Sequence, residues 1–147
     1  MARTKKGGYL ILKIKHLNGR LFNRYISEDG RIVFNAEQGK IISALYDKSP
    51  MSAGELSKVT GLANSTLTLM LKRLEEQELI ISQSDELDKR IKFFSLTDFG
   101  KEQQEIGQEV SQKLSNVFYD GFTDKEIETV ENLLERILNN LDKEMEK

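Results

Sequence analysis

The residues of this sequence that could do chemistry are concentrated on one face of a helix predicted at about 64–77. Apolar residues at helical spacing predict its buried stripe, which consists of Leu67, Met70, Leu71 and Leu74. The 3.6-residue period turns another set outward, namely Ser65, Thr68, Leu69, Lys72 and Glu76. Small hydroxyl groups and a lysine on a free helix face can contact base edges and phosphates in a DNA major groove. An ordinary solvated helix face explains the same residues equally well.

A second group of charged residues lies in the polar segment 84–90. This segment separates two β-rich runs, 79–81 and 91–96, and the three together predict a hairpin with a charged loop. Arg90 could enter a DNA minor groove while the nearby Asp88 holds its guanidinium group in place. The alternative is a solvated turn with a local ion pair.

The elements that must position these residues form a predicted winged helix-turn-helix over 52–97. Ser52 and Glu55 have the S-x-x-E spacing of a capping box, which begins a short helix. Gly61 ends this helix, because glycine accepts the left-handed conformation of a helix stop. Either Asn64 or Ser65 is predicted to cap the second helix, and the hairpin follows as the wing.

Helical patterns flank this unit on both sides. An apolar repeat predicts a helix over 8–26, and Asn35 is predicted to cap another. That helix turns one set of side chains inward, namely Ile41, Ile42, Leu45 and Tyr46. A long helix after residue 97 has one apolar stripe, which consists of Ile106, Val110, Leu114, Val117 and Phe118. Thr123 begins a strongly amphipathic last helix, which needs a partner from the same chain or from a second subunit.

The composition excludes several classes of chemistry. The chain of 147 residues has no Cys and one His, which excludes disulfides, thiolate metal sites and a multi-His metal site within one subunit. No phosphate-binding loop, membrane-length apolar run or signal-peptide core is present. We therefore expect no cofactor, no membrane association and a cytoplasmic protein. An enzyme is a third hypothesis, without a catalytic constellation to support it.

The net charge of −2 is unevenly distributed along the chain. Residues 1–100 carry 16 Lys and Arg against 12 Asp and Glu, whereas residues 101–147 carry 6 against 12. Electrostatic attraction to DNA depends on one face rather than on the total charge, so the total does not exclude DNA binding. We expect such binding to be modest and strongly weakened by salt.

Several short motifs resemble the MarR family of bacterial transcription regulators. They are L-A-N-S-T-L-T at 62–68, R-L-E at 73–75, L-I at 79–80, D-K-R at 88–90 and L-T-x-x-G at 96–100. The resemblance implies a mainly α fold with a small β-hairpin wing and with N- and C-terminal dimerisation helices. It implies a dimerisation region at 1–34 and 98–147 and a DNA-binding domain at 35–97. Three residues depart from the usual pattern: Leu69 and Ser82 stand where Arg is frequent, and Glu78 stands where Gly is common.

The hypothesis that follows is a homodimeric regulator, usually a repressor in such proteins, bound to a near-palindromic double-stranded DNA. Contacts to base edges are assigned to Ser65, Thr66, Thr68 and Leu69. Contacts to phosphates are assigned to Lys72 and Arg73. In the wing, Arg90 would enter the minor groove, Asp88 would orient it, and Lys89 would bind the backbone.

The resemblance also implies a pocket for a small phenolic or aromatic effector. Candidate residues for this pocket are His16, Arg20, Phe22 and Tyr46. A regulator without any ligand is equally consistent with the residues. The principal alternative function is a winged-helix module for protein interaction without specific DNA binding. It would present Leu69 and the acidic residues Glu75, Glu76 and Glu78 to a protein partner.

Overall fold

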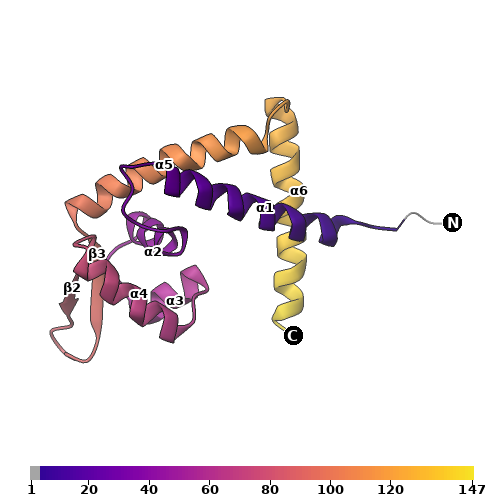
Figure 1. Ribbon diagram of the computed structural model, residues 1–147. Coiled ribbons are helices and arrows are strands. Elements are labelled where there is room, and N and C mark those ends of the chain that lie inside the picture. Colours follow the sequence, from indigo (N-terminus) through magenta and orange to yellow (C-terminus); the bar gives the residue numbers. More distant parts are fainter. Residues whose placement is uncertain (1–3) are drawn as a thin grey trace. The chain divides into compact units, whose positions relative to one another are not determined.

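The computed structural model describes residues 4–147, most of which are helical (Figure 1). The elements follow in the order α1 (Gly7–Glu28), α2 (Ala36–Asp47), β1 (Met51–Ser52), α3 (Ala53–Thr60), α4 (Asn64–Glu76), β2 (Ile80–Ser84), β3 (Lys92–Leu96), α5 (Asp98–Phe118) and α6 (Asp124–Met145). Contacts group the described chain into two compact units, one up to Leu114 and one from Ser115 onward. The first three residues of the predicted dimerisation region lie outside the described residues.

Three predicted helix starts are confirmed, because each is encoded by a local capping box. The side chain of Asn35 accepts a hydrogen bond from the Gln38 amide, and the Gln38 side chain accepts one from the Asn35 amide. Ser52 with Glu55 begins α3 in the same way, and Thr123 with Glu126 begins α6. Each pair satisfies amide groups that a helix N-terminus otherwise leaves without partners. Gly61 ends α3 at φ 73°, as predicted.

The start of the second helix of the pair differs from the prediction. Ala63 is the N-cap residue of α4, and no side chain caps the helix. Asn64 and Ser65 are already helical, so neither of them serves as the predicted cap. The first-turn amides of α4 are therefore open to solvent or to a bound group.

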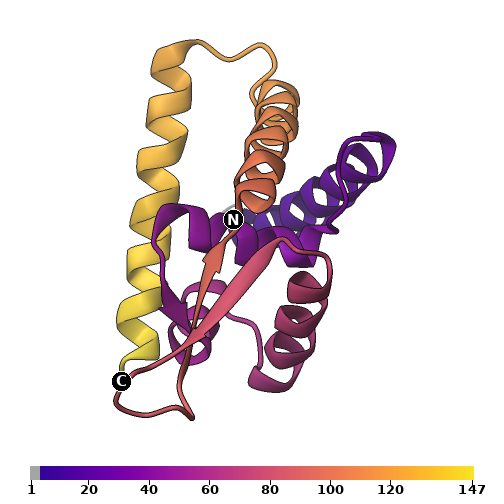
Figure 2. The same ribbon diagram turned by 90° about the vertical axis from the view of Figure 1, so that its left-hand side faces the viewer.

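The wing is a hairpin within a small antiparallel sheet (Figure 2). In the described part of the chain this sheet has three strands in the order β1-β3-β2. The hairpin pairs Ile80 with Leu96 and Ser84 with Lys92. The short strand β1, which the sequence analysis did not predict, pairs Met51 with Phe94. A strand of two residues, Met51 and Ser52, is too short to show an alternation of apolar and polar residues in the sequence. Its extended backbone depends on pairing with β3.

A buried core holds α2, α3, α4 and the sheet together. Its most completely buried large side chains are Ile41, Ile42, Leu45, Met51, Leu56, Leu67, Leu74, Leu79 and Ile80. The predicted stripe of α4 is confirmed, with Leu71 also buried and Met70 half-buried against the core. Tyr46 was wrongly predicted to face inward, since 42% of it is exposed. It lies next to the last residue of α2, where the inward stripe has already ended.

The L-T-x-x-G motif has a specific role at the junction of the sheet and α5. The Thr97 hydroxyl oxygen accepts a hydrogen bond from the Gly100 amide (3.0 Å), so Thr97 caps α5. The same hydroxyl donates to the Glu78 carbonyl oxygen (2.6 Å). A side chain at Gly100 would collide with the Leu79 carbonyl oxygen, so only glycine permits this close approach.

The buried face of α5 is more polar than the predicted apolar stripe. Val110 and Leu114 are buried as predicted, and Ile106 is half-buried. Gln103 and Gln104 are also buried and hydrogen-bonded, which the apolar pattern could not reveal. Val117 and Phe118, at the other end of the predicted stripe, are 49% and 39% exposed.

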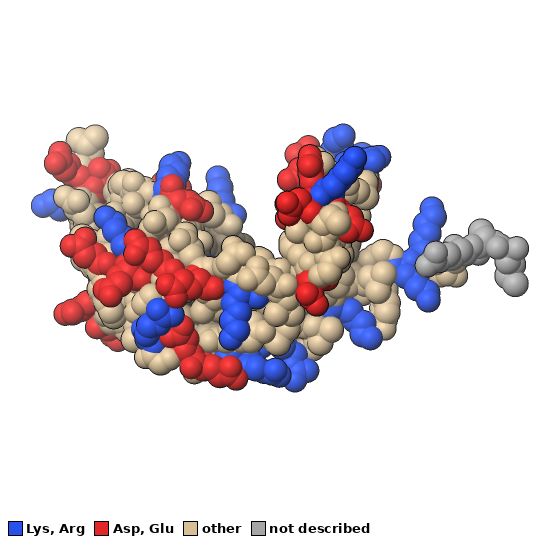
Figure 3. All heavy atoms as spheres, turned by 90° about the horizontal axis from the view of Figure 1, so that it is seen from above, with Lys and Arg blue, Asp and Glu red and all other residues tan. Residues whose placement is uncertain are grey.

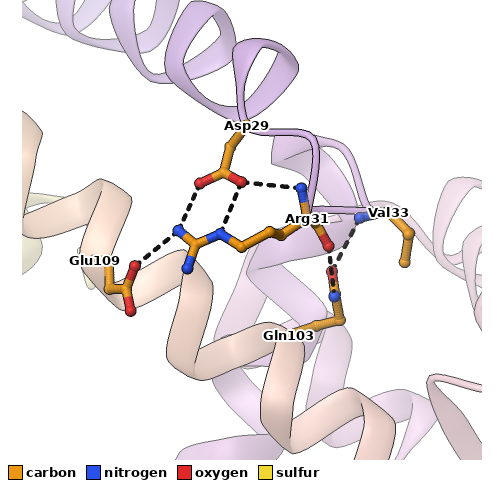
Figure 4. A network of polar contacts seen from close by, with 5 residues as sticks. All are labelled: Asp29, Arg31, Val33, Gln103 and Glu109. Carbon is orange, nitrogen blue, oxygen red and sulfur yellow. Dashed lines mark hydrogen bonds and ion pairs between the residues drawn. The ribbon is translucent and has the colours of Figure 1, made fainter.

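The connection between α1 and α2 is attached to α5 by a network of polar contacts (Figure 4). Arg31 donates to both carboxylate oxygens of Asp29 and forms an ion pair with Glu109 at 2.8 Å. Hydrogen bonds from Arg31 lower the pKa of Asp29 to about 2. Next to this cluster, the Gln103 side chain contacts the backbone of Arg31 and Val33.

Large apolar side chains remain exposed on two of the long helices. On α1 they include Leu10, Ile14 and Leu17, and on α6 they include Leu133, Leu134, Ile137, Leu138 and Leu141. No described residue of α6 is buried. Both helices carry the predicted apolar repeat, and these apolar side chains are exposed.

The backbone at Glu78 leads to a stability prediction. Among residues 4–147, Glu78 is the only non-glycine residue with positive φ, at 62°. Side chains other than glycine are strained in this region by roughly 1–2 kcal/mol, partly offset by the greater flexibility of glycine in the unfolded chain. Glu78→Gly should therefore raise the free energy of unfolding by about 0.5–1 kcal/mol, measured by denaturant titration.

Glu105→Gly is the matched control for this prediction. Glu105 is exposed within the regular part of α5. The same substitution there should lower the free energy of unfolding by about 1 kcal/mol, because glycine is a poor helix former. A loss of stability in both variants would contradict the interpretation of Glu78.

Candidate nucleic-acid interface

The outward face of α4 presents the predicted DNA-contacting residues to solvent. The exposed residues are Ser65, Thr66, Thr68, Leu69, Lys72 and Arg73. This orientation follows from burial of Leu67, Leu71 and Leu74 on the opposite side. Leu69, at 51% exposure, places an apolar group among the hydroxyls. The face can therefore offer hydrogen bonds, a methyl contact and positive charge to the same partner.

Thr68 has a restricted hydrogen-bonding role. Its hydroxyl donates to the Asn64 carbonyl oxygen at 2.8 Å, one helical turn earlier. With its proton engaged, the exposed oxygen retains acceptor capacity toward solvent. In a major groove this oxygen would accept from the amino group of adenine or cytosine, while the methyl group could contact thymine.

The predicted contact between Asp88 and Arg90 in the wing is confirmed. Two nitrogens of the Arg90 side chain donate to the two oxygens of Asp88, each at 3.0 Å, and the Arg90 amide donates at 3.1 Å. These hydrogen bonds lower the pKa of Asp88 and raise the pKa of Arg90. The Arg90 side chain is 90% exposed, so Asp88 orients a guanidinium group that still faces solvent.

A groove connects α4 to the wing and brings several candidate residues together. Its volume is about 670 Å³. Thr68 and Lys72 line it from α4, and Arg90 lines it from the wing. The remaining lining residues are Ser52, Ala53, Gly54, Leu71, Glu75, Ile91, Lys92 and Phe94. Side chains of three separate segments therefore surround one space that is open to solvent.

Other predicted residues lie outside this groove. Ser65, Thr66, Leu69, Asp88 and Lys89 do not line it. Arg73 lines a different cavity of about 770 Å³, together with Asn23, Val33 and Gln77. The structure therefore separates Lys72 from Arg73, although both received the same predicted role.

The sequence analysis did not assign the other lining residues to this groove, among them Lys92 and the first turn of α3. Lys92 is the first residue of β3 and lines the groove together with Arg90, which lies in the turn before that strand. Because a turn has no fixed side-chain alternation, the spacing of the two residues gave no signal of their shared position. The first turn of α3 contributes Ala53, which has only a methyl group, and Gly54, which has no side chain, so neither gave a chemical signal.

The predicted effector residues are not brought together. Phe22 lines a cavity of about 670 Å³ between α1, α2, α3 and α5, whose walls include Lys15, Phe34, Lys40 and Gly107. His16, Arg20 and Tyr46 are exposed and do not line this cavity. Phe34 was missed because it precedes α2 in a short connection, where no periodic pattern marks a buried residue.

Charged side chains of both signs are distributed over the surface of the described residues. On the face seen in Figure 3, acidic side chains are prominent at the left and are interspersed with Lys and Arg. Within residues 4–147, no group of three or more His, Asp or Glu is arranged to hold a metal ion. No helix of that part is long and apolar enough to cross a membrane.

The comparisons with known proteins agree on one family. The model of the MarR family matches residues 34–92. The transcriptional regulator SarZ of Staphylococcus epidermidis is 32% identical over 108 residues, covering 73% of this chain and 72% of SarZ. The regulator MgrA of Staphylococcus aureus is 26% identical over 130 residues, covering 87% of each chain.

A solved structure of MarR from E. coli in complex with operator DNA has a similar fold. The TM-score is 0.77 at 29% sequence identity, covering 89% of this chain and 92% of that chain. This likeness confirms the predicted fold class, which is mainly α with a small β wing.

The paired wing residues give a prediction on the pKa of Asp88. The carboxyl group of Asp88 should titrate below its ordinary value of 3.8, because the charged form accepts hydrogen bonds from Arg90. Its contribution to stability should be present above pH 3.8 and disappear as the pH falls through the lowered pKa. NMR titration of the side-chain carboxyl carbon measures this value.

Two variants separate charge from geometry in this pair. Arg90→Ala should return the pKa of Asp88 toward 3.8. Arg90→Lys keeps the positive charge but cannot make the two-pronged contact, and it should restore only part of the lowering. An Asp88 pKa that is the same in all three proteins would show that the contact does not form in solution.

Proposed function

Because the chain belongs to the MarR family of transcriptional regulators, we propose that it is a sequence-specific double-stranded DNA-binding repressor that acts as a homodimer. The observation that carries this proposal is the groove in which Thr68, Lys72 and Arg90 converge from α4 and the wing. The Thr68 hydroxyl and three cations around an open groove, namely Lys72, Arg90 and Lys92, suit a partner with both base edges and phosphates. MarR of E. coli, with a similar fold, is known in complex with operator DNA. A regulator of this kind works on the chromosome, in the cytoplasm of a bacterium.

In the proposed complex, α4 lies in a major groove of the duplex. Ser65, Thr66, Thr68 and Leu69 are exposed on one side of the helix and would meet base edges. Lys72 follows one turn after Thr68 and would meet a phosphate at the edge of the groove. The uncapped first turn of α4 offers additional amide groups to the backbone.

The wing would contact the adjacent minor groove. Arg90 is held by Asp88 but remains 90% exposed, so its guanidinium group is oriented before DNA arrives. A side chain that is already oriented loses less conformational entropy on binding. Lys89, exposed beside it, would bind the phosphate backbone.

The exposed apolar faces of the long helices support the proposal of a homodimer. Residues 1–34 and 98–147 would form the dimerisation region, and 35–97 the DNA-binding domain. No described residue of α6 is buried, although Leu134, Ile137 and Leu141 repeat along one side. Contiguous apolar surface of this kind usually marks an interface. A two-fold dimer would also place two copies of α4 on the two half-sites of a near-palindrome.

We also propose an aromatic effector for the cavity lined by Phe22. Phe22 and Phe34 provide aromatic surface at this cavity, and Lys15 could meet the carboxylate of a small phenolic acid. Lys40 also lines the cavity but pairs with Glu37 at 3.3 Å, and Asp47 adds a second carboxylate to the lining. The effector would release DNA only by binding more tightly to a conformation that cannot bind DNA.

One observation favours the alternative of a protein-interaction module. The outward side of α4 carries Leu69 at 51% exposure, with Glu76 also exposed nearby. An apolar side chain with acidic neighbours would suit a basic protein partner. DNA retention separates the two functions directly, since a protein-interaction module would retain no specific duplex.

Selection of bound duplexes from a random pool tests the DNA-binding proposal. At low and then physiological salt, we expect enrichment of a two-fold motif with half-sites about one helical turn apart. Salt-sensitive retention without any sequence motif would reject the specific regulator and favour the alternative.

Two substitutions in the groove should have different effects on the selected duplex. At one position of each half-site, Thr68→Ala should reduce the affinity ratio between the preferred base pair and the others by about 5- to 150-fold, because the substitution removes a base contact. Lys72→Ala should weaken binding to all duplexes and reduce the slope of log K against log salt by about one per subunit. Lys101→Ala, on the exposed surface of α5, is the control for charge. Uniform loss in the Thr68 variant would reject its role in reading bases.

Calorimetry against a panel of phenolic acids tests the effector proposal. A ligand found in this way should bind the Phe22→Ala variant about three- to tenfold more weakly, because the variant loses aromatic contact. His16→Ala is the matched control, since His16 is exposed and does not line the cavity. Absence of binding across the panel would reject the effector proposal and leave the DNA-binding proposal intact.

A further inference from the structure

Two side chains from different helices hold the peptide groups of one linker residue. The Val33 amide donates to the Gln103 side-chain oxygen at 2.9 Å, as Figure 4 shows. The Val33 carbonyl oxygen accepts from the Gln77 side-chain nitrogen at 3.0 Å. Gln103 belongs to α5, and Gln77 is the C-cap residue of α4. A continuous chain of hydrogen bonds therefore runs from α5 through Val33 to the end of α4.

In this series of hydrogen bonds, Gln77 and Gln103 each use both the oxygen and the nitrogen of the side-chain amide. The Gln103 nitrogen donates to the Arg31 carbonyl oxygen at 2.9 Å. The Gln77 oxygen accepts from the Gln38 nitrogen at 3.0 Å, and Gln38 itself belongs to the capping box of α2. Rotating either amide by 180° would place like atoms against each other, so only one orientation satisfies all partners.

The linker is also held by apolar packing, since Phe34 is buried in the core and Ile32 packs against it, whereas its ion pair is a weaker constraint. The ion pair between Arg31 and Glu109 is exposed, with 54% and 63% of the two side chains accessible. Exposed ion pairs contribute little, because solvent screens them. Val33 exposes 47% of its surface, so its own apolar packing is limited. By contrast, Gln103 is only 2% exposed, and a hydrogen bond in such a place is costly to break.

We propose that Gln77 is a positioning residue for DNA reading, because it ties the end of α4 through Val33 to Gln103 of α5. This inference rests on the proposed function, in which α4 reads DNA. Gln77 does not line the groove that holds Thr68, Lys72 and Arg90, so its effect on DNA is indirect. The bridge is one of the contacts that fix the end of α4 relative to α5, and it therefore contributes to the position of the reading face.

The surroundings of Gln77 indicate that its loss would affect position more than stability. Gln77 is half-buried and lines a cavity of about 770 Å³, together with Val33. Water can enter such a space and satisfy the Val33 carbonyl oxygen once the Gln77 donor is removed. The fold should therefore survive, while the link between the two helices is lost.

The absence of Cys from the sequence permits a direct distance measurement. Spin labels would be attached to Leu69→Cys on α4 and Glu105→Cys on α5, two exposed positions. Labelled protein would be mixed with excess unlabelled protein, so that few dimers contain two labelled subunits. Pulsed electron paramagnetic resonance then reports distances between the two labels of one chain. The labelled protein with Gln77 unchanged should give one narrow distance distribution.

Two substitutions of Gln77 isolate the hydrogen bond to Val33. Gln77→Ala removes both contacts, whereas Gln77→Glu keeps the shape and the acceptor for Gln38 but cannot donate to Val33. Both should broaden or shift the distance distribution and reduce the preference for the selected duplex over random DNA by about two- to tenfold. Gln108→Ala, exposed on α5, should change neither quantity.

The outcomes separate this inference from the proposed function. An unchanged distance distribution in Gln77→Glu would overturn the positioning role, whether or not the protein binds DNA. A changed distribution with an unchanged preference for the selected duplex would also overturn it. If the original chain retains no specific duplex, the proposed function fails first, and with it the role of Gln77 in DNA reading.

Discussion

Burial of one stripe of α4 is the constraint on which the candidate interface depends. Leu67, Leu71 and Leu74 are almost completely removed from solvent, and a helix has only one rotation that buries all three. The same rotation turns Thr68 and Lys72 outward, toward the groove beside the wing. The chemistry of the free face is thus a consequence of packing on the other face. Any change that loosened the core would also misorient the hydroxyl and the lysine.

The junction after the wing extends this constraint to the rest of the domain. Thr97 caps α5 and also hydrogen-bonds to the backbone at Glu78, directly after α4. Gly100 permits the close approach because it has no side chain to collide with Leu79. At the same end of α4, Gln77 hydrogen-bonds to Val33 of the linker, which in turn hydrogen-bonds to Gln103. The end of α4 is therefore attached to α5 by two separate routes.

The sequence predicted those parts of the structure that are encoded locally. The capping boxes at Asn35, Ser52 and Thr123 involve residues three positions apart, and each began a helix as predicted. The hairpin and the contact between Asp88 and Arg90 are similarly local. The prediction failed where distant residues decide the outcome. Strand β1 exists through its pairing with β3, and Gln103 is buried because the linker supplies its partners.

The candidate interface was predictable in composition but not in arrangement. Helical periodicity placed Thr68 and Lys72 on one face, yet it could not show that Arg73 lies at a different cavity. Lys92 joins the groove because the hairpin returns it beside Arg90. For the effector, only Phe22 of the predicted set lines this cavity, because the cavity is assembled from helices that are distant in sequence, namely α1, α2, α3 and α5.

The measurement that tests the central claim most directly is an NMR titration of the protein with the selected duplex. The account predicts that the largest changes in backbone amide shifts fall on α4 and the wing, around Thr68, Lys72 and Arg90, with smaller changes elsewhere. Changes centred on other surfaces, with these three residues unaffected, would contradict the proposal that this groove binds DNA.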